Sequence, residues 1–411
     1  MLDVEFVRRQ FPAFAEPSLR GQAFFENAGG SYACAEVISR LGEYYRRLKV
    51  QPYYVYPAST EAGEWMDEAR RRLGEYLGVA TDEVHFGAST SQNTYVLAQA
   101  VRPMLKSGDE IVVTNQDHEA NSGAWRRLTS LGVVVKQWGV NPETGALDVA
   151  QLDRLLTQRT RLVSFPHASN LVAYVNPVKQ IVAKAHAVGA LTVVDGVAWA
   201  PHGLPDVPSL EADIYLFSLY KTYGPHQGIM VMRRQVADRL GNEGHYFNTH
   251  DVFKRLAPAG PDHAQIAASR GIAEYFDTLD THHHSGAGER SAVSKAQRVR
   301  ELLHSTELPL LTTLLEYLRS RRDIRLLGPV QAQGRAATVS FVPKSIEPQE
   351  LATRLARHGF MVGYGNFYAV RLLEAMGVNP ARGAVRLSFV HYTSAAEVAG
   401  LIDALESALQ G

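Results

Sequence analysis

The 411-residue sequence has a single cysteine, Cys34, and it lacks both a net charge and long hydrophobic runs. One thiol excludes an internal disulfide and any metal site built from several cysteines. Lys and Arg together number 42, as do Asp and Glu, so no overall basic field is available to hold nucleic acid or an anionic membrane. These absences favour a small neutral or zwitterionic partner, and we expect no nucleic-acid partner.

No run of about 20 apolar residues is present to form a membrane span. The N-terminal stretch MLDVEFVRRQFPAFAEP carries charges inside what would have to be the apolar run of a signal peptide. We therefore expect a cytoplasmic protein that does not associate with membranes. With 45% hydrophobic and 20% charged residues, the chain can bury one large core or two moderate ones.

Between residues 83 and 234, short apolar runs rich in β-branched residues alternate with helical patterns. These runs are apolar at successive positions, which is typical of a mostly parallel sheet covered by helices on both faces. Segments 91–105 and 176–190 have the apolar spacing of crossover helices. Besides one expected near residues 83–86, the predicted strands are 109–115, 132–138, 160–166, 190–196, 213–218 and 228–234.

After about residue 280 the pattern changes to long charged helices and fewer strands, which predicts a smaller α+β domain closing on the first. The expected division is an N-terminal segment 1–16 that packs with the small domain, a large domain 17–285 and a small domain 286–411. The segment THHHSGAG (281–288) is expected to be a solvated loop. Adjacent histidines diverge and no carboxylate or thiol spacing supports them, so we predict no metal site.

Polar side chains follow several of the predicted strands, at the edge where an open parallel sheet collects its ligands. Thr90 and Ser91 open a helix after the first strand and can donate to phosphate oxygens there, although both types are also ordinary helix caps. Ser218 ends a later strand and offers another phosphate donor. This part of the sequence is therefore suited to binding a phosphate group.

Three further strand ends carry groups suited to a planar ring. His118 can stack on such a ring or serve as a hydrogen-bonded structural residue. Asn170 can donate to a ring oxygen or cap a helix. Asp195 can stabilise a nearby cation, such as a protonated pyridine nitrogen, or cap a turn.

Lys221 connects these residues. It lies in DIYLFSLYKTYGPHQG, and an apolar-flanked lysine has a depressed pKa and can form an imine with an aldehyde, whereas most lysines are solvated surface residues. Phosphate donors, a ring stacker, a ring-oxygen donor, a pyridinium partner and an imine lysine together describe a site for pyridoxal 5′-phosphate.

The motifs STSQN, DHEAN and PHASN, then VVDG and, 26 residues after its aspartate, the lysine of FSLYKTYGP, resemble the class V aminotransferase group, in particular cysteine desulfurase-like proteins. The resemblance runs from FFENAGG to AVRLSFVHY and implies an α/β fold-type I enzyme that uses pyridoxal phosphate. It implies Lys221 as the Schiff-base and proton-shuttling lysine, Asp195 as the partner of the pyridine nitrogen and His118 as the ring-stacking imidazole. A homodimer with the active site near the interface is also implied.

The resemblance assigns the other site residues as well. It implies Asn170 near the ring oxygen, Thr90, Ser91 and Ser218 near the phosphate, and Arg386 as the clamp for the substrate carboxylate. Val385 and Leu387 flank Arg386, so we expect it to be partly buried and to need an anionic partner, which an internal salt bridge would also supply. The remaining expected contacts are Tyr368 and Asn27 with the substrate. In the loop where the family brings a phosphate contact from the neighbouring subunit, Gly260 and His263 replace the usual threonine-rich sequence, which argues against that contact here.

Three departures from the desulfurase pattern concern the reaction. Ala198 stands where that pattern has glutamine, and Tyr220 where it usually has histidine. The loop expected to carry the sulfur-accepting cysteine corresponds to GYGNFYAV, with Tyr368 near the expected position. Cys34 is expected to be a small buried hydrophobe.

We therefore predict an enzyme that converts a small amino acid through an external aldimine and a quinonoid, by β-elimination of the C–S lyase type or by transamination. The alternatives are a cysteine desulfurase, an amino-acid epimerase and a non-catalytic protein that binds pyridoxal phosphate. A nucleotide-dependent enzyme is disfavoured because G-x-G-x-x-G after the first strand and G-x-x-x-x-G-K-[ST] are both absent.

Overall fold

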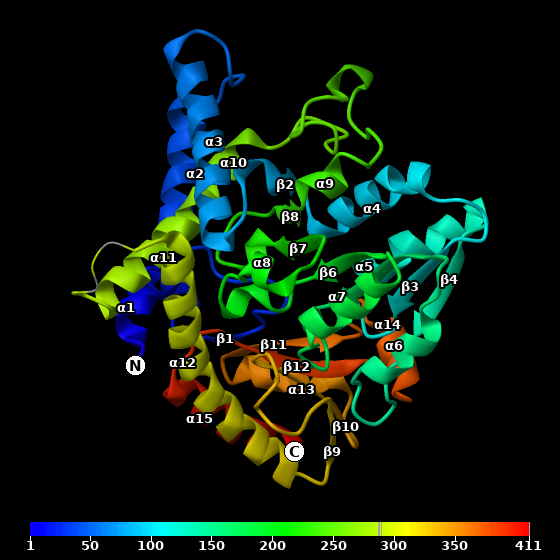
Figure 1. The fold of residues 1–411 in the computed structure, drawn as a ribbon. Coiled ribbons are helices and arrows are strands. Elements are labelled where there is room, and N and C mark those ends of the chain that lie inside the picture. The colour runs from blue at the N-terminus through cyan, green and yellow to red at the C-terminus, as the bar shows by residue number, and fades with distance from the viewer. Residues whose placement is uncertain (287, 289, 411) are drawn as a thin grey trace.

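The larger part of the molecule is built on a seven-stranded sheet (Figure 1). The computed structural model describes residues 1–286, 288 and 290–410. Neighbouring strands, in the order β2-β8-β7-β6-β5-β3-β4, run parallel except that β8 is antiparallel to both β2 and β7. This confirms the mostly parallel sheet. The strands are β2 (Val84–Gly87), β3 (Glu110–Thr114), β4 (Val134–Trp138), β5 (Thr160–Pro166), β6 (Leu191–Asp195), β7 (Ile214–Ser218) and β8 (Gly228–Met232).

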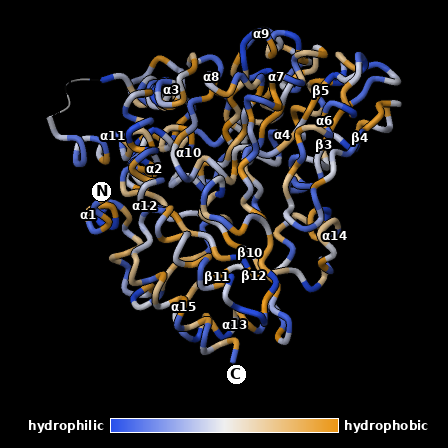
Figure 2. The backbone as a smooth tube through the Cα atoms, turned by 60° about the horizontal axis from the view of Figure 1, so that its bottom comes forward, coloured by the Kyte–Doolittle hydropathy of each residue, from blue (hydrophilic) through white to orange (hydrophobic). Residues whose placement is uncertain are grey.

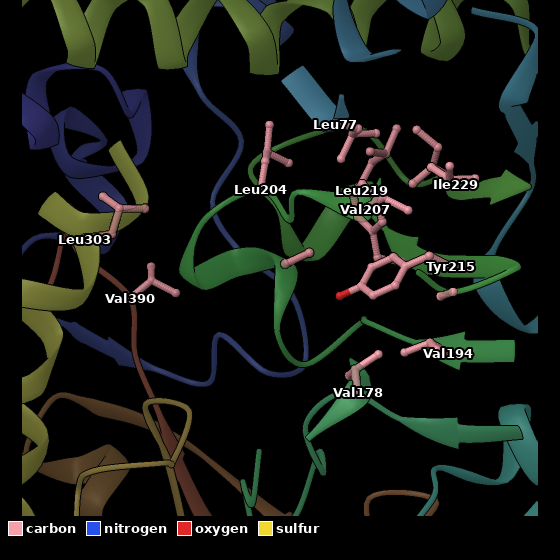
Figure 3. Close-up of a cluster of buried hydrophobic side chains, with 14 of the residues drawn as sticks. Leu77, Val178, Val194, Leu204, Val207, Tyr215, Leu219, Ile229, Leu303 and Val390 are labelled. Atoms are coloured by element: carbon pink, nitrogen blue, oxygen red, sulfur yellow. The ribbon is translucent and has the colours of Figure 1, made fainter. Parts of the chain in front are cut away.

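Helices cover both faces of this sheet, which explains the continuous apolar runs. Alternate residues of a strand point to opposite faces, so Tyr215 belongs to one buried cluster and Leu216 to the other. Figure 3 shows Tyr215 in the first cluster, near Val194 of β6. The first face is covered by α6 (Val149–Leu155), α7 (Val178–Ala187) and α8 (Val207–Leu210), and the second by α4 (Thr90–Ala100), α5 (Glu119–Arg126) and α9 (Arg234–Ala237).

Strand β4 differs from the expectation that every strand would be buried on both faces. It lies at the edge of the sheet and pairs only with β3 among the described strands. Val134 is 46% exposed, and the Lys136 ammonium pairs with the Glu110 carboxylate at 2.7 Å. The apolar run of this segment therefore predicted a strand correctly, but it did not predict that the strand is partly exposed.

The smaller part contains a five-stranded sheet in the order β1-β11-β12-β10-β9, which confirms the α+β pattern. All neighbours are antiparallel except β1 and β11. Figure 2 shows β10, β11 and β12 in this lobe together with α13 and α15. The elements are β1 (Ala23–Phe25), β9 (Ile324–Leu327), β10 (Thr338–Pro343), α13 (Pro348–Arg357), β11 (Phe360–Gly365), α14 (Val370–Ala375), β12 (Ala384–Ser388) and α15 (Ala395–Gln410).

The domain limits remain a prediction. Two features of the chain concern them. Residues 23–25, expected in the large domain, form the β1 edge strand of the smaller sheet. The long helix α12 (Ala292–Ser320) contributes Leu303 to the core of the larger part and Leu314 to that of the smaller part, and it runs along both in Figure 1. The other helices are α1 (Val4–Arg9), α2 (Ala35–Arg47), α3 (Pro57–Leu77), α10 (His263–Ala268) and α11 (Arg270–His283).

The N-terminal helix contacts both parts. The guanidinium of Arg8 donates to the Tyr392 carbonyl at 3.0 Å, just beyond β12, while Asp3 accepts from His282 at the end of α11. His282 also stacks on Phe6, with ring centroids 3.6 Å apart. The predicted loop 281–288 is therefore wrong for its first three residues, which end helix α11; Ala287 lies outside the described residues.

Among the described residues, no helix combines the length and the apolar character that crossing a membrane requires.

Candidate active site

A cavity opens at the carboxyl ends of β5, β6 and β7, where the start of α4 meets them. Because the strands are parallel, the residues that follow them in sequence lie along one edge of the sheet. The cavity brings together every residue predicted to bind the cofactor. Its lining consists of Ser89, Thr90, Ser91, His118, Ala120, Pro166, Ala168, Asn170, Asp195, Val197, Ala198, Ser218, Tyr220 and Lys221.

Hydroxyl groups gather at the end of the cavity near α4. Thr90 Oγ1 lies 2.8 Å from Ser218 Oγ, and both side chains are buried. Ser89 is the N-cap of α4, and its hydroxyl accepts from the Gln92 amide at 3.1 Å. Ser91 lies in the first turn and is more exposed. Hydroxyl donors, first-turn amides and the positive end of the helix dipole together suit a phosphate group.

Asp195 is the last residue of β6 and is buried. Its carboxylate accepts from the Val197 amide at 2.9 Å, and no Lys, Arg or His in the described part of the chain forms an ion pair with it. Burial raises its pKa to about 6, against the opposing effects of the Val197 hydrogen bond and the Lys221 charge. A buried carboxylate without a cationic partner is suited to a ligand that brings the positive charge.

Lys221 ends a short 3-10 helix directly after β7. Burial and the Arg386 charge lower its pKa to about 8, while Asp195 and Glu26 act in the opposite direction. The ammonium makes no hydrogen bond or ion pair with the described residues. Its Nζ lies 5.7 Å from the Tyr220 ring centroid. A larger fraction of this amine is therefore neutral near physiological pH than in a solvated lysine.

His118 is the N-cap of α5, and its Nδ1 accepts from the Ala120 amide at 3.1 Å. Burial lowers its pKa to about 4, aided by the charges of Lys221 and Arg386, so the imidazole is neutral and can stack. Asn170 donates from Nδ2 to the Phe367 carbonyl at 2.9 Å, while its buried Oδ1 has no partner. One amide hydrogen of Asn170 thus remains available for the expected ring oxygen.

A second cavity adjoins the first and shares His118, Asn170, Tyr220 and Lys221 with it. The remaining lining comes from the segment after β1, from β11 and its following loop, and from β12. These residues are Glu26, Ala28, Gly29, Val362, Gly363, Tyr364, Gly365, Asn366, Phe367, Tyr368 and Arg386. The position beside Lys221 makes this the candidate substrate cavity.

Arg386 is buried in β12, and its predicted need for an anionic partner is met within the chain. Nη2 lies 2.7 Å from Glu26 Oε1, and Nη1 donates to the Asn170 carbonyl at 3.1 Å. The guanidinium also lies over the Phe367 ring, 4.1 Å from its centroid, and Nε has no hydrogen-bond partner among the residues that the structure describes. The salt bridge weighed in the sequence analysis is therefore present, inside the cavity that Arg386 was expected to serve.

Tyr368 lies at the mouth of this cavity and is 70% exposed. Its carbonyl accepts from the Glu119 amide at 2.8 Å, and its ring centroid lies 5.0 Å from that of His118. Both Phe367 and Tyr368 have positive φ angles, of 52° and 55°, which side-chain-bearing residues rarely adopt. Contrary to the expected loop 363–370, Gly363 and Gly365 belong to strand β11, so the loop proper begins at Asn366.

Asn27 and Cys34 lie outside both cavities. Asn27 was expected to contact the substrate, but its Nδ2 donates to the Ser388 carbonyl at 3.2 Å and its Oδ1 accepts from the Tyr392 hydroxyl. The structure thus places Asn27 away from the cavity, where its side chain joins the segment after β1 to Ser388 and Tyr392, and its contact with the substrate stays a prediction. Cys34 is completely buried, as predicted, and burial raises its pKa well above the usual range.

Two charged residues near the site, Glu26 and Asp117, were not predicted from the sequence. Glu26 lies within the quoted FFENAGG motif, yet nothing in the sequence linked it to Arg386, 360 residues away. Asp117 precedes His118 and is buried, accepting from Thr114 and, at 2.8 Å, from Asn121. Burial raises its pKa to about 8. Its position directly after an apolar strand was the available signal.

The first cavity fits pyridoxal phosphate by the chemistry of its side chains. Thr90, Ser91 and Ser218 can hold the phosphate, the unpaired Asp195 carboxylate can hold a protonated pyridine nitrogen, and Lys221 supplies an amine for the aldehyde. His118 and Asn170 complete the set beside the ring. Since Lys221 also lines the second cavity, both cavities meet at this amine.

Comparison with known proteins agrees with this chemistry. The sequence model of the family described as "Aminotransferase class-V" matches residues 23–401. The chain is 34% identical over 421 residues to "Aminotransferase-like protein FGM3" of Gibberella zeae, covering 99% of this chain and 98% of that protein. It is 30% identical over 421 residues to "Cysteine desulfurase-like protein ustD" of Aspergillus flavus, covering 99% and 90% of the two.

The fold matches a solved structure as well. The apo structure of a cysteine desulfurase from Thermococcus onnurineus NA1 superposes with a TM-score of 0.85 at 24% identity, covering 100% of this chain and 99% of that one. This likeness identifies the architecture as fold-type I. The chain belongs to the class V aminotransferase family, in its cysteine desulfurase-like branch, and is a pyridoxal-phosphate-dependent enzyme.

Proposed function

We propose that this enzyme converts a small amino acid by β-elimination, of the C–S lyase type, or by transamination, and that it is not a cysteine desulfurase. The observation that carries this proposal is the absence of a thiol from the lining of both cavities. The chain's one cysteine is buried at the start of α2, and its Sγ lies 3.6 Å from the Gly271 carbonyl. Persulfide formation requires an accessible thiolate beside the substrate sulfur.

The residues of the two cavities have distinct tasks in this proposal. Bound pyridoxal phosphate supplies an aldehyde for amines and a ring that withdraws electrons from the substrate Cα. Lys221 would act as the general base that takes the proton from the substrate Cα and as the acid that returns it. Asp195 keeps the positive charge on the pyridine nitrogen, and His118 holds the ring plane. Arg386 binds the substrate carboxylate.

Product analysis tests the proposal. The purified protein, loaded with pyridoxal phosphate, is incubated with the common amino acids, including cysteine. β-Elimination would release ammonia and a 2-oxo acid in equal amounts, together with the leaving group. Transamination would yield a 2-oxo acid without ammonia, limited to one equivalent per enzyme unless a second 2-oxo acid is added to accept the amino group. Racemisation alone would favour the epimerase, a protein-bound persulfide would favour the desulfurase, and cofactor binding without any turnover would favour a non-catalytic binder.

We also propose a homodimer whose active sites lie near the interface, in the cytoplasm. Large apolar side chains are exposed on the connection between α2 and α3 and on the turn at Tyr246–Asn248, and such surfaces commonly mark contacts with other chains. Gly260 lies in the loop before α10, and His263 is the first residue of that helix. Light scattering tests the assembly, since a monomer at micromolar concentration would contradict it, and fractionation tests the location. The exposed residues are Tyr53, Tyr54, Val55, Tyr56, Tyr246 and Phe247.

A further inference from the structure

The substrate cavity holds a carboxylate that the proposed reaction does not use. Glu26 follows β1, and its side chain, 29% exposed, lines the cavity with Lys221 and Arg386. Its Oε1 pairs with Arg386 Nη2 at 2.7 Å. An enzyme that binds an anionic amino acid places a negative charge beside its own carboxylate clamp, and this arrangement needs a reason.

Two glycines make room for the Glu26 carboxylate. A Cβ added at Gly29 would lie 1.8 Å from Glu26 Oε2, and one added at Gly363 would lie 2.9 Å from Oε1. These glycines come from the turn after β1 and from β11, so two separate elements leave space for the same group. The carboxylate can therefore occupy this position beside Arg386 because neither element places a Cβ there.

Arg386 retains donors while Glu26 stays in place. Glu26 and the Asn170 carbonyl each accept from one terminal nitrogen, and Nε, though buried, has no partner in the described part of the chain. A guanidinium carries five N–H donors, enough to serve two carboxylates. The α-carboxylate of a substrate can thus pair with Arg386 without displacing Glu26.

A second carboxylate on the substrate would have no such partner. Among the residues that line this cavity, the lysine and arginine are Lys221 and Arg386 alone, and His118 is neutral because its pKa is lowered to about 4. Lys221 acts on the amino group and Cα, while Arg386 is shared by the α-carboxylate and Glu26. An acidic side chain would therefore meet only the repulsion of Glu26.

The rest of the cavity suits a cation or a hydrogen-bond donor. Tyr364 and Tyr368 are 48% and 70% exposed at its mouth, and aromatic faces attract ammonium and guanidinium groups. Resting on the proposed function, we infer that Glu26 selects the substrate: it excludes amino acids with acidic side chains and favours those whose side chain ends in an amino, guanidino or hydroxyl group.

Binding measurements on the holoenzyme test this inference. The change in the cofactor's absorption is titrated with L-ornithine, L-norvaline and L-glutamate, which have similar length but positive, neutral and negative side chains. We expect ornithine to bind at least about tenfold more tightly than norvaline, and glutamate at least about tenfold more weakly. In Glu26→Gln both differences should shrink to within about threefold.

Matched variants separate the charge from a general disturbance. Gly29→Ala should act like Glu26→Gln, because the added Cβ displaces the carboxylate, whereas in Gly30→Ala the Cβ would lie 3.6 Å from Tyr220 and change nothing. Glu119→Gln removes a nearby carboxylate that pairs with Arg371 outside the cavity lining, and it should bind like the parent.

Two outcomes would overturn the inference. If the holoenzyme binds glutamate as tightly as ornithine, or if Glu26→Gln and Gly29→Ala keep the parent's order of affinities, Glu26 does not select the substrate, while the proposed reaction stands. A protein that takes up pyridoxal phosphate but shows no spectral response to any amino acid overturns the proposed function and this inference with it.

Discussion

The hydroxyl oxygens of Thr90 and Ser218 lie 2.8 Å apart, which joins the first residue of α4 to the last residue of β7. One of the two must donate to the other in the absence of a phosphate. With a phosphate present, both can donate to it, so the cradle is held in shape before the cofactor arrives.

This relationship gives the first prediction. Replacing Thr90 by Val or Ser218 by Ala should weaken pyridoxal phosphate binding by about tenfold or more, since a hydrogen bond to a charged group contributes about 1.5–3 kcal/mol. The measurement is the dissociation constant from absorbance or fluorescence titration. Thr94→Val is the control, because the Thr94 hydroxyl donates to the Thr90 carbonyl within α4 and does not line the cavity. Equal affinities in all variants would refute the phosphate assignment.

Lys221→Ala should abolish the yellow imine band and turnover while leaving the fold intact, because the role of this lysine is chemical. The loss of activity should reach at least about 10²-fold, the scale of losing a general acid–base group. The visible spectrum reports the imine band, an activity assay reports turnover, and circular dichroism with the melting temperature reports the fold. Lys184→Ala, which removes a surface ion pair with Asp153, is the control. Full activity of Lys221→Ala on any substrate of the parent would contradict the assignment.

Asp195→Ala should slow exchange of the substrate α-proton by about 10²-fold or more, because the pyridine nitrogen would lose the negative charge that keeps it protonated. Exchange into deuterated water is followed by NMR at saturating pyridoxal phosphate. Cofactor occupancy is measured on the same samples, so that weaker binding is not mistaken for slower chemistry. An unchanged exchange rate at full occupancy would rule out this role.

Cys34→Ser should retain the natural activity, and cysteine with a reductant should leave no persulfide on the protein. The serine hydroxyl can donate to the Gly271 carbonyl as the thiol does, and the position lies outside both cavities. Intact-mass spectrometry detects a persulfide directly. A persulfide on Cys34, together with loss of sulfide release in the serine variant, would support the cysteine desulfurase function instead.

Asp117 gives a prediction for stability against pH. Burial raises its pKa to about 8, from about 3.9 for an exposed Asp. Between these values the folded chain keeps a proton that the unfolded chain has lost, so this residue makes the free energy of unfolding fall as pH rises. Asp117→Asn mimics the protonated form, and its stability relative to the parent should grow from pH 4 to 8. Urea unfolding at several pH values measures it; a constant difference would contradict the raised pKa.

The cofactor half of the site could be predicted from the sequence because parallel strands place their ends at one edge. Lys221, Asp195, His118 and Asn170 each follow or end a strand, and all four line the first cavity. The prediction of parallel strands was therefore sufficient to predict that the residues at their ends lie close together.

The substrate half was harder, because it depends on orientation within an extended segment. Neighbouring residues there point to opposite sides, so Glu26 lines the cavity while Asn27 bonds to Ser388 and Tyr392. The motif located the segment that reaches the cavity, but the sequence did not indicate which of the two residues faces it. The ion pair between Glu26 and Arg386 required the smaller sheet, whose β1 edge strand gave no clear signal in the sequence.

The β1 edge strand also affects the order in which the two halves of the site can form during synthesis on the ribosome. Every residue of the first cavity has been synthesised by Lys221, and the seven-stranded sheet is complete at β8. Strand β1 is among the earliest segments made, but its one partner among the described strands is β11, which begins at Phe360. Since chains emerge at roughly 5–20 residues per second, the cofactor half exists for several seconds before the substrate half can form. A nascent chain thus contains every residue of the cofactor cavity before it contains Tyr368 and Arg386 of the substrate cavity.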